Sequence, residues 1–187
     1  MSDGSYKDGR GSAAVILEGD TCKGRASFSM TVPGDSGEMS AYRAELAGLY
    51  AAIRFIMKLC DYYNVSSGGV YFGCDGLSAL QQSFSLFPPA IDTPIYDILS
   101  AIHNARILCP VEWTTLHIKG HQDDDLSYDH LDRWGQLNVE ADALAKAVLS
   151  SGQGYVCHYL VPFEPWSVWF KGKKLSQLSK QIYCIIH

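Results

Sequence analysis

The sequence contains no apolar run that approaches the roughly 18 residues of a membrane-spanning helix, and its N-terminus shows no charged segment followed by an apolar stretch. These two absences argue against a membrane-spanning protein and against secretion. At 187 residues, of which 47% are hydrophobic, the chain is long enough for one domain with a sizeable core. We therefore expect a soluble, intracellular protein, in the cytoplasm or the nucleus.

Closely spaced cysteine pairs are also lacking. The six cysteines are irregularly spaced, and none belongs to a CxxC pair. This spacing favours neither a disulfide framework nor a structural zinc site. Free thiols in a reducing compartment are the better interpretation.

The chain has little basic charge. Its formal net charge is −5, which argues mildly against a protein whose main task is to hold nucleic acid by electrostatic attraction. The charge is uneven, because residues 151–187 contain four lysines and one glutamate, a net of +3, which leaves −8 for residues 1–150. Five aspartates crowd into residues 122–133, but this run lacks the glycine and the closing glutamate of an EF-hand loop. A solvated loop is favoured there over a calcium site.

The predicted elements follow the order of an α/β protein, β-β-β-α-β-α-α-β-α. Residues 12–19 and 24–32 predict a hairpin, since β-branched and aromatic residues lie between glycines. Ser40 is a suitable N-cap for a long amphipathic helix that reaches about Tyr63. The elements expected next are a strand ending near Asp75, a helix over 77–84, a helix over about 94–108, a strand over 111–121 and a helix over 137–149.

Past Gly154 the pattern changes. We expect an extended stretch, a strand that runs into a lysine-rich turn, and a final amphipathic segment. These elements would form an appendage outside the main domain.

Four acidic residues, Asp3, Glu45, Asp75 and Asp142, lie at the end or edge of apolar elements. Each has an ordinary explanation by itself: a mobile terminus, a helix-surface acid, a turn residue, and a partner of Lys146 one helical turn away. Together they would repel and raise one another's pKa unless a cation neutralised them. Oxygen ligands alone favour magnesium or manganese over zinc.

Five short motifs then occur in one specific order: "DGS" at 3–5, "RAEL" at 43–46, "CDG" at 74–76, "KGH" at 119–121 and "NVEADALA" at 138–145. In this order they resemble a type 1 ribonuclease H domain, of the kind fused to reverse transcriptases in retroelement polyproteins. The resemblance covers about residues 2–150. It implies a ribonuclease H-like α/β fold over residues 1–152, with a five-stranded mixed sheet flanked by helices. Residues 153–187 would then be a C-terminal extension with a strand, a turn and a helix.

The same resemblance implies endonucleolytic hydrolysis of the RNA strand of RNA/DNA hybrids, with 5′-phosphate products and two Mg²⁺ ions, which Mn²⁺ can replace. The implied metal ligands are Asp3, Glu45, Asp75 and Asp142. With His121, which would assist proton movement or product departure, they make up the implied catalytic set. The implied substrate contacts are Gly4, Ser5, Tyr42 and Asn138, and the implied partners are the hybrid and a reverse transcriptase domain of the same polyprotein.

The chain departs from the family pattern at its first strand. Such strands usually begin several residues before the aspartate, whereas only Met1 and Ser2 precede Asp3. We therefore expect a clipped first strand, and a chain that is a fragment or starts at a misplaced position. Gly76 and Tyr42 also replace residues that are common in the family. These two differences weaken the implied substrate contacts more than the implied chemistry.

Two other interpretations compete with the enzyme. A ribonuclease H-like fold can be kept as a catalytically impaired module that binds nucleic acid or protein, and loss of a carboxylate would mark such a module. The four acids are all present, which favours catalysis. A transposase or integrase core shares the fold and the two-metal chemistry, but it would place its last acid differently and would not need "RAEL" on the long helix.

Overall fold

The computed structural model describes residues 1–151, apart from 20–23, 35, 91 and 94, together with two short strands, β6 (Trp169–Phe170) and β7 (Lys173–Lys174). The strands of the main domain are β1 (Ser2–Lys7), β2 (Arg10–Glu18), β3 (Arg25–Thr31), β4 (Gly69–Cys74) and β5 (Glu112–His117). The helices are α1 (Ala41–Tyr63), α2 (Leu77–Ser83), α3 (Tyr96–Leu108) and α4 (Arg133–Ser150). Two 3₁₀ turns, Gln122–Asp124 and Tyr128–His130, lie in the acidic run. The predicted order of elements is confirmed.

The strands of the main domain form two separate sheets in the part of the chain that the structure describes. β1, β2 and β3 make an antiparallel meander, in which Asp3 faces Ala14 and Val15 faces Phe28. β4 and β5 pair in parallel, with Cys74 facing His117. The expected five-stranded mixed sheet is therefore not formed as one sheet. Only the start of β1 reaches the end of β4, where the Met1 side chain lies against Gly73. This overlap is too short for a ladder of hydrogen bonds between the two strands.

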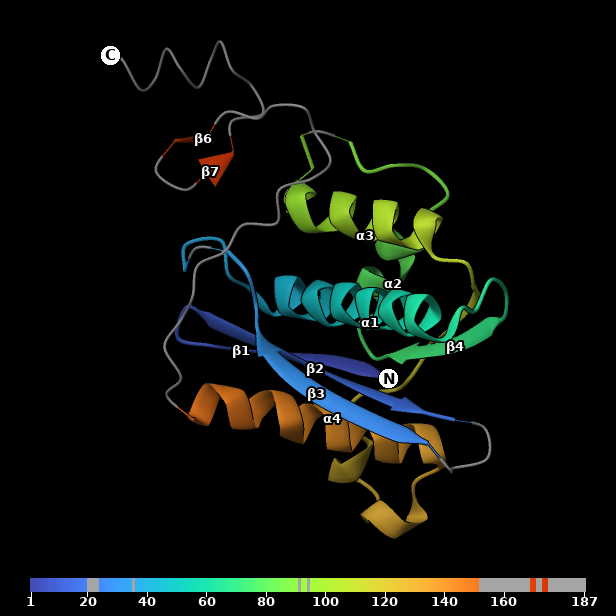
Figure 1. Cartoon of the computed structure of the whole chain (residues 1–187). Coiled ribbons are helices and arrows are strands. Elements are labelled where there is room, and N and C mark those ends of the chain that lie inside the picture. Colours follow the sequence, from blue (N-terminus) through green and yellow to red (C-terminus); the bar gives the residue numbers. More distant parts are fainter. Residues whose placement is uncertain are drawn as a thin grey trace.

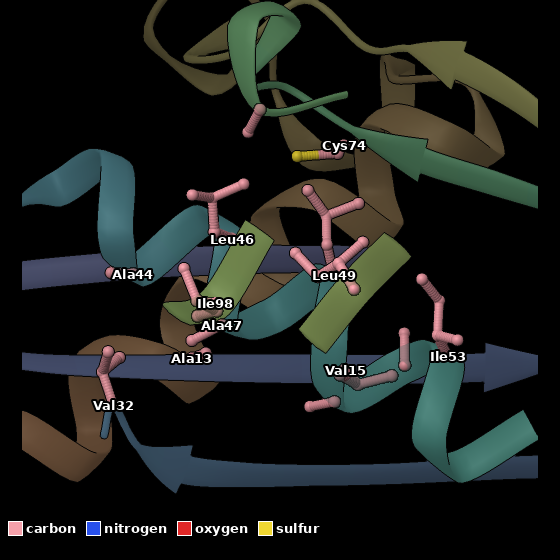
Figure 2. Close-up of a cluster of buried hydrophobic side chains, with 14 of the residues drawn as sticks. Ala13, Val15, Val32, Ala44, Leu46, Ala47, Leu49, Ile53, Cys74 and Ile98 are labelled. Carbon is pink, nitrogen blue, oxygen red and sulfur yellow. The ribbon is translucent and has the colours of Figure 1, made fainter. Parts of the chain in front are cut away.

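Two helices cover opposite faces of the meander (Figure 1). The helix α1 packs on one face and α4 on the other, and α3 lies against the far side of α1. Figure 2 shows the main core between β2 and α1, with Ala13 and Val15 on the strand side, Leu46 and Leu49 on the helix side, and Ile98 of α3 in the same cluster. All five side chains are buried, so apolar burial in this layer is the main force that fixes α1 on the sheet.

Helix boundaries follow from capping groups. The Ser40 side chain accepts a hydrogen bond from the Arg43 backbone N–H at 3.1 Å, which confirms Ser40 as the N-cap of α1. The expected start of α4 at residue 137 is wrong, because Asp132 caps the helix by accepting from the Gly135 N–H at 2.7 Å. That cap adds a first turn at Arg133 to a helix whose apolar stripe begins only at Leu137.

The C-terminal residues are described only in part. β6 and β7 pair antiparallel, which agrees with the predicted strand that runs into a lysine-rich turn. The final amphipathic segment lies outside the described residues, and the division of the chain at residue 152 stays a prediction. Within the described ranges, Cys60, Cys74 and Cys109 are free and buried, and no helix is both long and apolar enough to cross a membrane.

Candidate active site

The four acidic residues come from four different elements. Asp3 lies in β1, Glu45 in the first turns of α1, Asp75 directly after β4, and Asp142 in the middle of α4. The charges of Asp75 and Asp142 both act on Asp3, and the charges of Asp3 and Asp75 act on Glu45. The structure therefore brings all four carboxylates into one electrostatic group.

Small residues let β1 and α1 approach closely, and this approach places Asp3 beside Glu45. A Cβ added at Gly4 would lie 2.3 Å from both the Ala44 carbonyl carbon and the Glu45 nitrogen. Gly48 of α1 also lies near β1, but less tightly, because an added Cβ there would be 3.2 Å from the Ser2 Cβ. Any side chain at Gly4 would push the helix away from the strand, so the glycine sets the spacing of the two acids.

Burial makes the charged state of the central pair costly. Asp3 is only 4% exposed. Burial, and then the charges of Asp75 and Asp142, raise the pKa of Asp3 well above its ordinary value, although hydrogen bonds with the Gly4 amide and Glu45 offset part of the rise. Burial, and then the charges of Asp3 and Asp75, likewise raise the pKa of Glu45. A cation held between these carboxylates would restore their anionic form.

Glu45 and Asp75 meet around a cysteine that sequence reasoning missed. One ligand atom each from Glu45, Cys74 and Asp75 lie within 4.8 Å of one another. The Cys74 Sγ donates to Glu45 Oε2 at 3.5 Å and accepts from the Gly76 N–H at 3.3 Å. Burial and the neighbouring Glu45 raise the pKa of this thiol, so it stays protonated and acts as a hydrogen-bond donor to Glu45. Its position directly before Asp75 was the available signal.

Asp142 projects from a helix that lies close to the sheet. Ala141 and Ala145 are fully buried, and the Ser12 hydroxyl of β2 donates to the Ala145 carbonyl at 2.6 Å. The carboxylate of Asp142 is half-buried and accepts a hydrogen bond from Lys146 Nζ at 2.6 Å. Asp142 is thus both the i,i+4 partner of Lys146 and a neighbour of Asp3. The ammonium of Lys146 already compensates part of the negative charge there.

The segment after β5 passes directly over Asp75. A Cβ at Gly120 would lie 2.9 Å from Asp75 Oδ2, so a larger residue there would displace the carboxylate. The next residue, His121, has φ 53° and is exposed. His117, at the end of β5, contributes its Nε2 at 3.0 Å from the Asp75 carbonyl oxygen, a contact that sequence reasoning missed. His121 therefore directly follows the residue that contacts Asp75.

The expected substrate contacts are spread over the same region. Gly4 and Ser5 are half-buried in β1, and Asn138 is buried one helical turn before Asp142. Within the described residues, the Asn138 Oδ1 and the Tyr42 hydroxyl are buried without hydrogen-bond partners. Burial also raises the pKa of Tyr42. An unpaired polar atom at such a position is costly unless a ligand or water satisfies it.

The donor set fits hard divalent cations. Four carboxylates supply oxygen ligands, the atoms that Mg²⁺ and Mn²⁺ prefer, while the raised pKa values of Asp3 and Glu45 indicate an uncompensated negative cluster. Within the described residues, Glu45 and Asp75 lie close enough together, beside Cys74, to hold one ion, and Asp3 and Asp142 interact with this group through their charges.

Comparison with known proteins adds evidence on the fold. No family model and no curated protein matches the sequence. Among solved structures, RNase H1 from the halophilic archaeon Halobacterium salinarum NRC-1 is similar with a TM-score of 0.54 at 15% identity, over 81% of this chain and 96% of that chain. The N-terminal RNase H domain of Rv2228c from Mycobacterium tuberculosis, solved as a fusion with maltose-binding protein, gives a TM-score of 0.47 at 10% identity, over 80% of this chain and 91% of that chain.

The first of these likenesses defines the class of the fold. The chain is a mixed α/β protein with a ribonuclease H-like fold. At 15% identity the likeness concerns the fold alone.

Proposed function

We propose that this chain is a ribonuclease H, which cuts the RNA strand of RNA/DNA hybrids endonucleolytically and leaves 5′-phosphate products. The observation that carries the proposal is the convergence of Asp3, Glu45, Asp75 and Asp142 on a ribonuclease H-like scaffold. The archaeal protein of similar fold is an RNase H1, which supports the same substrate class here.

The proposed cofactors are two Mg²⁺ ions, with Mn²⁺ as a substitute, held by Asp3, Glu45, Asp75 and Asp142. When bound, such ions neutralise charge on the scissile phosphate and lower the pKa of water. Asp3 is the central ligand in this proposal, because its side chain is buried and the charges of both Asp75 and Asp142 act on it.

The remaining site residues have proposed roles toward the nucleic acid. The backbone of Gly4 and Ser5, together with Glu45, would contact the 2′-hydroxyl that distinguishes RNA from DNA. Tyr42 and Asn138 would use their unpaired buried polar atoms to contact the hybrid. His121, exposed beside Asp75, would carry a proton or assist product departure.

The biological setting is also a proposal. The motif order supports a retroelement origin with a reverse transcriptase domain in the same polyprotein, acting in the cytoplasm or nucleus. Sequencing the genomic DNA upstream of Met1 tests this setting. An in-frame reverse transcriptase is expected, and unrelated sequence would contradict it.

A cleavage assay tests the activity. Labelled RNA/DNA hybrid is incubated with the full chain in Mg²⁺ and in EDTA, with duplex DNA as the control substrate. Metal-dependent cutting of the RNA strand is expected. Cleavage that persists in EDTA, or equal cutting of duplex DNA, would overturn the proposal. Tight binding of hybrid without cleavage would instead favour the impaired binding module.

The variant Asp75→Asn tests the metal ligands. An amide is a poorer ligand than a carboxylate, so turnover should fall by about 10²–10³-fold, since metal ions supply several kcal/mol of charge stabilisation. The fold should persist, because the change also relieves carboxylate repulsion. Asp61→Asn is the matched control, since Asp61 is exposed and forms an ion pair with Lys58 at the far end of α1. Unchanged activity in Asp75→Asn would refute the assignment.

A further inference from the structure

The side chain of Glu45 is held both at its stem and at its carboxylate. A glutamate side chain has several rotatable bonds, and it loses rotamer freedom when it is fixed in one place. At the stem, a Cβ added at Gly76 would lie 3.2 Å from Glu45 Cγ, so the backbone after Asp75 packs against the side chain. At the carboxylate, the Cys74 Sγ donates a hydrogen bond to Oε2 at 3.5 Å. Cys74 therefore fixes one oxygen of this metal-binding group.

The thiol that holds Glu45 is itself fixed. Cys74 is fully buried at the end of β4, in the same core cluster as Leu46 of α1 (Figure 2). Its sulfur accepts from the Gly76 N–H at 3.3 Å, and its backbone carbonyl accepts from the Ile118 N–H after β5 at 3.0 Å. A buried thiol is a small, weak donor that has no water to turn to. The end of β4 therefore sets the position of the donor to Glu45.

The hydrogen bond from Cys74 to Glu45 joins two parts of the fold that carry different acids. Glu45 belongs to α1, which packs on the meander of β1, β2 and β3, whereas Asp75 follows β4 of the other sheet. One ligand atom each from Glu45, Cys74 and Asp75 lie within 4.8 Å of one another. The charge of Asp75 acts unfavourably on Glu45, so the two carboxylates repel when no cation is between them. The thiol supplies a contact that opposes their separation.

We propose that Cys74 is a positioning residue, whose thiol orients the Glu45 carboxylate and keeps it beside Asp75, so that the pair binds a divalent cation with little rearrangement. A group that hydrogen-bonds to a metal ligand typically changes metal affinity by about 10–100-fold. The weak S–H donor places Cys74 at the lower end of this range. The inference rests on the metal ligands of the proposed function, but it concerns binding of the ion and not cleavage of the hybrid.

Binding of Mg²⁺ alone to the full chain, without nucleic acid, tests this role. By calorimetry, Cys74→Ala should bind Mg²⁺ about tenfold more weakly than the parent chain, and Cys74→Ser, which keeps a donor, should recover part of the loss. Cys60→Ala is the matched control, because it removes another buried free thiol, at the far end of α1, and should leave the Kd unchanged.

These titrations separate the inference from the proposed function. Equal Mg²⁺ affinities of Cys74→Ala and Cys60→Ala, or no recovery in Cys74→Ser, would overturn the positioning role. Absence of Mg²⁺ binding by the parent chain would overturn this role and the proposed function together. Normal Mg²⁺ binding that weakens in Cys74→Ala, without any cleavage of hybrid by the parent chain, would contradict the proposed function and leave the positioning role intact.

The S–H stretching band of Cys74 gives a second readout on the parent chain. Infrared difference spectra against Cys74→Ser and Cys60→Ala assign the bands of the two thiols, also where Cys74→Ala does not fold. An ion on the Glu45 carboxylate changes the charge on Oε2, so Mg²⁺ should shift the Cys74 band and leave the Cys60 band in place. A thiol that only fills space in the core would show no shift. A Cys74 band that does not respond to bound Mg²⁺ would therefore refute the positioning role.

Discussion

Gly4→Ala should disturb both the stability and the activity of the protein through one methyl group. The added Cβ would lie 2.3 Å from two backbone atoms of α1, whereas ordinary contacts begin at 3.4 Å. The helix or the strand must therefore move by about 1.1 Å at this point, the difference between these two distances. Neither contact is with a flexible side chain, so the strain cannot be relieved by a rotamer change.

The energetic cost follows from the packing. Overpacking a core usually costs about 1–3 kcal/mol, and a backbone contact places this variant at the upper end. For a chain of this size about 3 kcal/mol corresponds to a fall in the thermal midpoint of about 6–12 °C. The same movement separates Glu45 from Asp3, and misplacement by about 1 Å can lower turnover about 10²-fold.

Calorimetry and the hybrid cleavage assay measure the two effects on one preparation. Gly69→Ala is the matched control, because Gly69 is also a strand glycine but its added Cβ meets no atom within 4 Å. This control should keep the thermal midpoint and the activity of the parent chain. If Gly4→Ala behaved like Gly69→Ala, the close approach of β1 and α1 would not be what sets the spacing of the acids.

Three further changes probe other parts of the structure. Asp97→Asn should cost about 3–5 kcal/mol in urea unfolding, since it leaves the buried Arg43 guanidinium without its anionic partner; a loss as small as that of Asp61→Asn would contradict this. His121→Ala should slow hybrid cleavage by about 10²-fold without changing the Mg²⁺ requirement, and complete inactivity would show that the histidine is more than auxiliary. Burial lowers the pKa of the Met1 amino group from 8.0 to about 6, so the unfolded chain binds a proton at this amine more readily than the folded chain does. The free energy of unfolding is therefore highest, as far as this group is concerned, above pH 8, and it falls as the pH drops through 6. Acetylating this amine should remove about 3 kcal/mol of that pH dependence; identical unfolding free energies of the two forms at pH 6 and pH 8 would refute the burial.

Much of the fold could be predicted from local patterns. The helical spacing of Leu46, Leu49 and Ile53 and the capping serine fixed α1 to within a residue. The start of α4 could not be found from apolar spacing, because its first turn depends on the Asp132 cap and not on burial. The division into two sheets was also not predictable, since it depends on how far β1 overlaps β4 in space.

The acidic residues of the site were predictable as a set, but their environment was not. Each acid sits at a recognisable position in a motif, whereas the contacts of Cys74 with Glu45 and of His117 with Asp75 are made across elements. The close pass of Gly120 over Asp75 likewise depends on tertiary structure. Sequence reasoning finds residues that share a motif and misses those that meet only after folding.

The separation of the two sheets also bears on the kinetics of folding. The meander of β1, β2 and β3 is continuous in sequence, whereas β4 reaches β5 only after α2 and α3 have been placed, and local contacts generally form before non-local ones. Asp3 belongs to the first unit and Asp75 follows a strand of the second, so their repulsion arises only when the two units dock. Interactions that form after the transition state change the unfolding rate and leave the folding rate nearly unaltered. If the two units dock after the transition state, the mutual repulsion of the acids would raise the unfolding rate and leave the folding rate nearly unaltered.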